Sequence, residues 1–211
     1  MLVVNCQFER AQYQFDFQFS LPEGQCLLVT GASGGGKSTL LDVIAGFISK
    51  KQVLFAQHDW SELSPDRRNC SFLMQKDNLF EHLSVRQNVG LALKSNLRLT
   101  REDQQKIEQV AEQLDINELL EKTPVQLSGG QNQRAALARS LIADRPLILL
   151  DEPFAALAKP ARLSALNLLQ ALAKQQQWTV VLVSHQPEEC RFMADYEVDI
   201  TAGKTQNWRK L

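Results

Sequence analysis

The residues best suited to chemistry form a glycine-rich turn in the first part of the chain. Gly31-Ala32-Ser33-Gly34-Gly35-Gly36-Lys37-Ser38-Thr39 follows the apolar run 26–30 and has the pattern G-x-x-x-x-G-K-S. Glycines allow such a loop to direct successive backbone N–H groups at phosphate oxygens, and a following helix adds the positive end of its dipole. The pattern predicts a phosphate site, with Lys37 on the β- and γ-phosphates and the Ser38 hydroxyl on Mg²⁺.

A pair of carboxylates ends a second apolar run. Asp151 and Glu152 follow Leu-Ile-Leu-Leu at 147–150. Magnesium takes few protein oxygens beside phosphate and water, so Asp151 suits its coordination shell. Glu152 has the chemistry to act on an attacking water as a general base. Adjacent acidic residues are more often a solvated surface feature, but the four apolar residues before this pair argue against that interpretation.

A second helix start also has the composition of an anion site. Ser128, Gly129, Gly130 and Gln131 follow Leu127 and precede a helical pattern over 134–143. A serine N-cap followed by glycines leaves backbone N–H groups available to an anion. The chain therefore carries two segments of phosphate-binding type.

The apolar runs predict the elements that position these residues. Runs at 26–30, 147–150 and 179–183 lack alternation, which is typical of parallel strands covered by helices on both faces. Polar residues follow the carboxyl ends of these strands, where open α/β sheets bind ligands; the third strand ends at Ser184-His185. Between Gln12 and Phe19 aromatic and polar residues alternate, which predicts an antiparallel ribbon beside the parallel core.

The middle of the chain, about 78–143, is expected to be mostly helical. Thr100 and Asp103 have the spacing of a capping box. The apolar residues after them recur at intervals of three and four, at Ile107, Val110, Ala111 and Leu114. Because no Gly-, Ser- or Pro-rich linker flanks this segment, we expect one domain over 1–211 with a helical subdomain inserted.

Composition excludes several classes of protein. Lys+Arg number 23 against 24 Asp+Glu in 211 residues, so no electrostatic surplus indicates a nucleic-acid partner. The four cysteines have no metal-ligand or redox spacing and are expected to be buried thiols in a reducing compartment. The N-terminus lacks the features of a signal peptide, and no apolar run approaches the ~20 residues of a bilayer span. We expect a soluble intracellular protein.

The motifs together resemble a known family. LSGGQ at 127–131, the phosphate loop and LILLDEP at 147–153 stand in the order found in nucleotide-binding subunits of ATP-binding cassette (ABC) transporters, and the resemblance covers nearly the whole chain. It implies an α/β fold: a P-loop NTPase (RecA-like) core with a parallel sheet flanked by helices, an N-terminal antiparallel β-subdomain and the inserted helical subdomain. It also implies ATP and Mg²⁺ as cofactors.

The resemblance assigns roles to further residues. Gln75 resembles the glutamine that touches Mg²⁺ and the attacking water, although alone it would be a polar loop residue. His185 resembles the histidine that contacts the γ-phosphate, and Glu152 and His185 form the implied catalytic pair. Mg²⁺ is implied to be held by Ser38, Gln75 and Asp151. Residues 128–131 are implied to contact ATP on the opposite subunit of a head-to-tail homodimer, chiefly through Ser128 and Gly130.

The chain departs from the family pattern at several positions. Ala158 stands where the family usually has an aspartate that couples the two ATP sites. Gly35 replaces a larger residue and is expected only to loosen the loop. The adenine-stacking aromatic is either Phe8 or Tyr13. A glycine-containing turn usual between Ile48 and Gln75 is absent, and the run 50–55 stands there.

The stretch 75–91 bears on the transported solute. Leu79, Phe80, Leu83 and Val85 form either a socket for a partner's apolar helix or part of the core. The stretch most resembles ATP-binding subunits of bacterial thiamine importers. That resemblance implies a transmembrane permease, a periplasmic solute-binding protein and a peripheral place on the cytoplasmic face of the inner membrane.

Other classes are weaker matches. Importers of molybdate, sulfate, iron or polyamines share much of the pattern, and Ala158 keeps a weakly hydrolysing regulatory module open. DNA-maintenance cassettes carry long coiled-coil insertions for which this chain has no room. Translation-associated cassettes join two cassettes in one chain, whereas each motif occurs once here.

Overall fold

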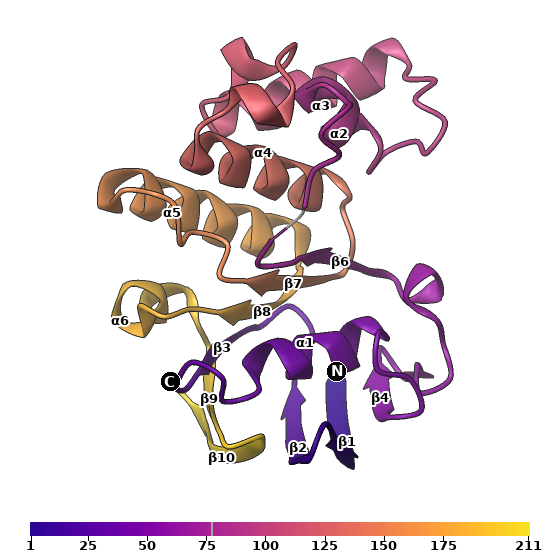
Figure 1. Ribbon diagram of the computed structural model, residues 1–211, viewed down its shortest axis with the longest axis vertical. Helices are drawn as coiled ribbons and strands as arrows, with labels where there is room; N and C mark the ends of the chain where they lie inside the picture. The colour runs from indigo at the N-terminus through magenta and orange to yellow at the C-terminus, as the bar shows by residue number, and fades with distance from the viewer. Residues whose placement is uncertain (77) are drawn as a thin grey trace.

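A single twisted sheet forms the frame of the computed structural model, which describes residues 1–76 and 78–211 (Figure 1). The strand order is β5-β4-β1-β2-β10-β9-β3-β8-β7-β6. The strands are β1 (Leu2–Arg10), β2 (Tyr13–Leu21), β3 (Cys26–Thr30), β4 (Gln52–Phe55), β5 (His58–Asp59), β6 (Cys70–Leu73), β7 (Leu147–Asp151), β8 (Thr179–Val183), β9 (Tyr196–Thr201) and β10 (Lys204–Lys210). The helices are α1 (Lys37–Ala45), α2 (Val85–Gly90), α3 (Arg101–Gln113), α4 (Gly129–Ile142), α5 (Lys159–Gln176) and α6 (Pro187–Cys190), with 3-10 turns at 65–67, 117–119, 124–126 and 191–193.

The predicted parallel core is confirmed. Strands β9, β3, β8, β7 and β6 pair side by side in parallel, and every residue of β7 and β8 is buried. Alternate residues enter two different apolar clusters: Ile148 and Leu150 pack toward α4 and α5, Leu147 and Leu149 toward α1 and the N-terminal strands. Figure 1 shows α4 and α5 on one side of β6–β8 and α1 on the other. This two-sided cover explains the uninterrupted apolar runs.

The N-terminal ribbon is antiparallel, as predicted, and continues into the core sheet. β1 pairs with β2 from Leu2↔Leu21 to Arg10↔Tyr13, and β4 pairs with the other edge of β1. β10 joins the ribbon to the core by pairing with β2 at Lys204↔Asp16 and with β9 along its length. The run 50–55 that replaces the usual glycine turn contains β4.

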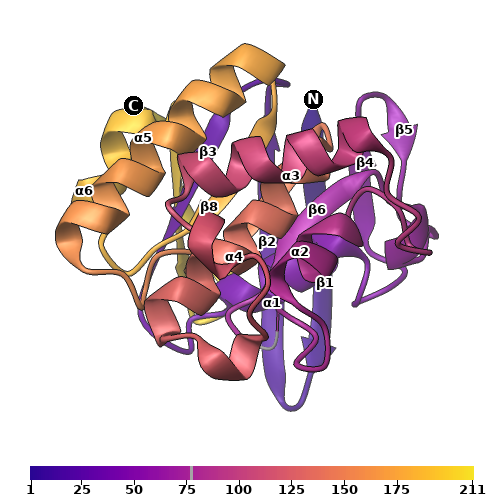
Figure 2. The same cartoon turned by 90° about the horizontal axis from the view of Figure 1, so that it is seen from above.

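The inserted helical segment has the expected caps and buried face. The Asp103 N–H donates to Thr100 Oγ1 (3.2 Å) and the Thr100 N–H to Asp103 Oδ2 (2.8 Å), which completes the capping box of α3. The apolar positions recurring after it are buried: Ile107, Val110, Ala111 and Leu114. Seen from above, α2, α3 and α4 lie together beside α5 (Figure 2). Within the described ranges, no helix combines the length and the apolar character of a membrane span.

The cysteines are free thiols, three of them buried and Cys70 half-buried. Burial raises the pKa of the Cys6 and Cys70 thiols to about 11. Among residues 1–76 and 78–211, no three His, Cys, Asp or Glu side chains cluster as metal ligands would. The cysteines are therefore apolar packing residues, as expected.

A buried arginine holds the C-terminal end of α1, the helix that begins in the phosphate loop. Arg68 Nη1 donates to the carbonyls of Val43 (2.8 Å) and Ile44 (2.7 Å), and Nη2 donates to Trp60 O (2.7 Å). Gly46 follows the helix with φ 92°, and a Cβ there would lie 2.7 Å from Arg68 Nε. The guanidinium thus donates to carbonyls at the end of the helix, where the regular helical hydrogen bonds run out; Val43 O also accepts the Gly46 N–H (3.2 Å).

We predict that Arg68→Met destabilises the chain by about 3 kcal/mol, because buried carbonyls lose their donors while the apolar volume is kept. Urea unfolding measures the free energy, with exposed Arg67→Ala as the control. Equal stability of Arg68→Met and Arg67→Ala would contradict the assigned role of Arg68.

Candidate nucleotide and hydrolysis site

The phosphate loop is a tight turn held from behind by the β9–β10 hairpin. Gly31 has φ 129°, and a Cβ there would lie 2.1 Å from the Ile200 carbonyl oxygen. The Gly203 N–H donates to Gly35 O (2.8 Å). A Cβ at Gly35 would stand 2.8 Å from Ile200 O, so this residue allows close packing and does not merely loosen the loop as the sequence suggested. The loop is therefore packed against the β9–β10 hairpin at Gly31 and Gly35.

Lys37 begins α1 with its ammonium inside the loop. Its side chain is buried, and Nζ donates to the carbonyls of Gly31 and Ala32, each at 2.8 Å. Ser38 is the second residue of α1 and Thr39 the third. The helix therefore starts where the sequence pattern predicted, and the Lys37 ammonium is bound by the carbonyls of the loop itself.

Asp151 ends β7 as a buried carboxylate that has the character of a metal ligand. It is 3% exposed, and Oδ1 is one of two fully buried side-chain polar atoms that lack a hydrogen-bond partner in the described part of the chain. Burial raises the pKa of this carboxyl, whereas the Ser38 hydroxyl, Lys37 and His185 act in the opposite direction. An unsatisfied carboxylate oxygen close to a hydroxyl fits the oxygen ligands of Mg²⁺.

Glu152 and His185 come together from the ends of adjacent strands. The parallel register Asp151↔Val183 brings both residues to one edge of the sheet, and His185 Nε2 lies 2.5 Å from Glu152 Oε1. The Glu152 N–H donates to Val183 O (3.1 Å). The backbone φ of Glu152 is 52°, a left-handed conformation that residues other than glycine rarely adopt. Strained backbone of this kind is common where a reacting group must be aimed.

The segment 128–131 starts α4, as the sequence predicted. Ser128 is the N-cap, with the Gln131 N–H donating to Ser128 Oγ (3.3 Å) and the Ser128 N–H to Gln131 Oε1 (2.9 Å). A Cβ at Gly130 would lie 3.2 Å from Ala156 O, and one at Gly129 3.8 Å from Ala156 Cβ. Gly130 therefore also allows α4 to approach the residues after Glu152, whereas the contact at Gly129 is an ordinary one.

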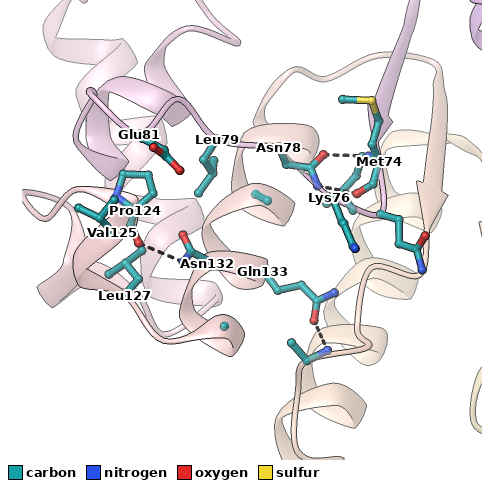
Figure 3. Close-up of a pocket in the computed structure, with 15 residues that line it drawn as sticks. Met74, Lys76, Asn78, Leu79, Glu81, Pro124, Val125, Leu127, Asn132 and Gln133 are labelled. Carbon is teal, nitrogen blue, oxygen red and sulfur yellow. Dashed lines mark hydrogen bonds between the residues drawn. The ribbon is translucent and has the colours of Figure 1, made fainter.

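A cavity of about 460 Å³ lies between α4 and the residues after β6. Gln75 is two residues beyond β6, which pairs with β7 at Leu73↔Leu150, so it stands at the same sheet edge as Asp151. It lines this cavity together with Asn132 and Gln133 of α4. Figure 3 shows these two side chains on one wall, with Met74, Lys76 and Asn78 opposite them.

Sequence reasoning missed two side chains that fix the site. Gln133 bonds both ends of the 152–156 turn: Nε2 donates to Glu152 O (2.9 Å), and Oε1 accepts from the Ala156 N–H (2.7 Å). Arg139 donates to Asn78 O (2.8 Å) and lies 5.0 Å above the Phe80 ring. Gln133 stands four residues after Gly129 and so on the same helix face, but this spacing does not reveal its partners in the 152–156 turn.

Comparison with protein families matches residues 15–155 to the ABC transporter family. The chain belongs to that family. The thiamine import ATP-binding protein ThiQ of Aliivibrio fischeri is 43% identical over 86% of this chain and 79% of its own length. The ThiQ of Haemophilus ducreyi is 41% identical over 97% of each.

Solved ABC cassettes have the same fold. The ATP-binding cassette MJ0796, dimeric in a post-hydrolysis state bound to ADP and Pi, matches with a TM-score of 0.89 and 26% identity over 100% of this chain and 99% of that one. A nucleotide-free cassette from an ABC transporter, 21% identical, matches with a TM-score of 0.85 over 99% of this chain and 90% of that one. The P-loop NTPase core with its β-subdomain and helical insertion is confirmed.

The exposure of side chains bears on two questions that the sequence left open: which aromatic residue stacks on adenine, and whether the 79–85 stretch forms a socket. Phe8 stacks on Phe15, with ring centroids 5.0 Å apart, whereas Tyr13 is 70% exposed. Tyr13 thus has the more accessible ring for a base. In the 79–85 stretch, Val85 is fully buried and belongs to the core, while Phe80 is 46% exposed. The socket interpretation therefore does not apply to Val85.

We predict that Asp151→Asn stabilises the ABC cassette at pH 7 by about 1 kcal/mol in chelator, because it removes a desolvated charge. The pKa of the Asp151 carboxyl is raised above its ordinary value of 3.8 in the folded protein. Below pH 3.8 the carboxyl is protonated in both the folded and the unfolded chain, and its stabilising effect on the fold is then at its full size. That effect is lost as the pH rises from 3.8 through the raised pKa of the folded protein. The advantage of Asp151→Asn should thus vanish below about pH 4. Urea unfolding across pH measures it, and a constant difference at every pH would contradict the prediction.

We predict that Ala158→Asp stabilises the chain by about 1 kcal/mol, because Ala158 is the N-cap of α5 and offers no side-chain acceptor. Pro160 has no N–H, so the new carboxylate would accept from the Ala161 N–H. Ala158→Asn should stabilise similarly, and Ala158→Val should not. Thermal and urea unfolding compare the three variants, and equal effects of Asn and Val would refute the capping argument.

Proposed function

We propose that this chain is the ATP-hydrolysing subunit of a bacterial thiamine importer. The observation that carries the hydrolytic part is the convergence of Asp151, Glu152 and His185 at the carboxyl ends of β7 and β8, next to the loop that holds Lys37. The solute follows from similarity, because relatives at 43% and 41% identity over most of the chain are named thiamine import proteins.

The phosphate loop and the Mg²⁺ ligands have separate roles in hydrolysis. The backbone N–H groups of residues 31–39 and the Lys37 ammonium bind and orient the β- and γ-phosphates. Ser38, Gln75 and Asp151 would hold Mg²⁺, which supplies charge neutralisation at the phosphate oxygens. Because Asp151 is already ordered and desolvated, its oxygen needs little rearrangement to serve as a ligand.

Glu152 orients the attacking water and accepts its proton. The water oxygen forms a bond to the γ-phosphorus while the bond to the bridging β–γ oxygen breaks, giving ADP and phosphate. His185, which lies against the Glu152 carboxylate, is 45% exposed at its side chain and can turn toward the γ-phosphate. When His185 turns away, the Glu152 carboxylate would be free to bind the attacking water.

We assign the segment 128–131 to ATP on the opposite subunit of a homodimer. Support comes from the capped, glycine-rich start of α4 and from the dimeric state of the MJ0796 cassette. One chain then supplies the phosphate loop to one ATP and Ser128, Gly129, Gly130 and Gln131 to the other, so a symmetric pair encloses two nucleotides.

The partner in the membrane is a permease, which we place on the groove between β6 and α4. This groove of about 520 Å³ is lined by Phe72, Met74, Phe80 and Arg139, and both Phe80 and Met74 are exposed. Buried Asn88 fixes the adjoining loop by accepting from the Phe80 N–H (2.8 Å) and donating to Leu83 O (3.1 Å). A periplasmic solute-binding protein and a peripheral place at the inner membrane complete the proposed importer.

We predict that Glu152→Gln lowers ATP turnover at least ~100-fold while ATP binding persists, and that Lys37→Ala weakens binding itself. Turnover and nucleotide affinity of the purified protein measure the two effects. Equal turnover of wild type and Glu152→Gln would refute the role of Glu152. A wild type without turnover would favour the regulatory module instead.

The solute is tested by uptake of labelled thiamine in a strain lacking this gene and any second uptake route. Restoration by wild type but not by Lys37→Ala is expected. Normal uptake in the deleted strain would refute thiamine and direct the search to molybdate, sulfate, iron or polyamines.

A further inference from the structure

The Gln133 amide is the one side-chain group that bonds the backbone at both ends of the turn after β7, among the hydrogen bonds of the described residues. Nε2 donates to the Glu152 carbonyl (2.9 Å) and Oε1 accepts from the Ala156 N–H (2.7 Å). Figure 3 shows the second of these bonds running from α4 down to the turn. A glutamine can make both bonds at once because its amide carries a donor and an acceptor.

The Glu152 carboxylate contacts His185, but the Glu152 backbone makes few hydrogen bonds besides the one from Gln133. Its N–H donates to Val183 O (3.1 Å), and its carbonyl otherwise accepts only the Ala155 N–H (3.3 Å) among the hydrogen bonds of the described residues. Its backbone φ of 52° lies outside the regions that residues other than glycine prefer. A residue in this conformation persists only where its surroundings fix it. The bond from Gln133 is the shorter of the two to the Glu152 carbonyl.

Gln133 also belongs to the helix that presents the segment 128–131. It lies one turn after Gly129, and the start of α4 contacts the same turn at Ala156, where a Cβ on Gly130 would come within 3.2 Å of the carbonyl oxygen. The start of α4 and the 152–156 turn are therefore packed together, so we expect a shift of the α4 start to act on the turn.

We propose that Gln133 is a positioning residue for hydrolysis: its amide ties the start of α4 to the Glu152 backbone, so that the carboxylate takes its working position only while segment 128–131 is in place. The inference rests on the proposed function of Glu152. It makes the water-orienting group of one ATP site sensitive, within the same chain, to the helix that serves the other site.

The test compares Gln133→Leu and Gln133→Glu with wild type in full-length protein. Leu removes both bonds, whereas Glu keeps an acceptor for the Ala156 N–H and loses the donor to Glu152 O. Both should lower kcat at least ~10-fold, with KM and ATP affinity within ~3-fold of wild type, because misplacement of a reacting group acts on the chemical step. Asn132→Ala is the matched control: it lines the same cavity but donates to Pro124 O (3.0 Å), away from Glu152.

A second arm separates positioning from a merely structural effect. In the Glu152→Gln background, single-turnover hydrolysis should lose nothing further on adding Gln133→Leu, because Gln133 acts through the Glu152 carboxylate. An unreduced penalty in that background would overturn the inference. So would a kcat of Gln133→Leu equal to that of Asn132→Ala.

Two further outcomes are also decisive. If Gln133→Leu lowers the melting temperature below the assay range, Gln133→Glu alone decides, and wild-type kcat in that variant overturns the inference. A wild-type protein that does not hydrolyse ATP contradicts the proposed function itself, which is a result distinct from any failure of Gln133.

Discussion

The two-sided burial of the parallel strands governs the rest of this molecule. β7 and β8 expose no residue along their length, since helices and the N-terminal strands cover both faces. Polar side chains can therefore stand only where the strands end. The parallel register brings the residues after Leu150 and Val183 to one edge, and the loop after β3 brings Lys37 there as well. Polar and charged side chains are concentrated at this edge because the apolar core leaves no place for them along the strands.

The same burial makes the site costly to maintain. Asp151 is desolvated with one oxygen unsatisfied, and Glu152 holds a left-handed backbone. Each feature opposes folding, and the cost at Asp151 would be relieved by a cation bound to its unpartnered oxygen. The apolar runs of the core and the guanidinium of Arg68 at the far end of α1 offset this cost. The stabilising interactions thus lie away from the edge that carries the site, and the destabilising ones lie at that edge.

Sequence reasoning succeeds where a residue's role depends on its near neighbours. The glycine pattern of the loop, the Thr100–Asp103 box and the apolar runs are local signals, and all three are seen in the structure. It fails where the deciding neighbour is distant. The tight packing of Gly35 depends on Ile200, the burial of Val85 on helices around it, and the role of Gln133 on a turn formed after β7. None of these pairings leaves a spacing that a single sequence reveals.

The start of α4 makes more contacts with the turn after β7 than an anion site requires. An N-capping serine and free N–H groups suffice to bind phosphate. They do not require a glycine at position 130 packed against Ala156, nor a glutamine shortly after it that bonds Glu152 and Ala156. These extra contacts are made with the turn that carries Glu152, the proposed general base. The start of α4 therefore has two faces with separate tasks: one presents N–H groups outward, and the other constrains the backbone from which Glu152 projects.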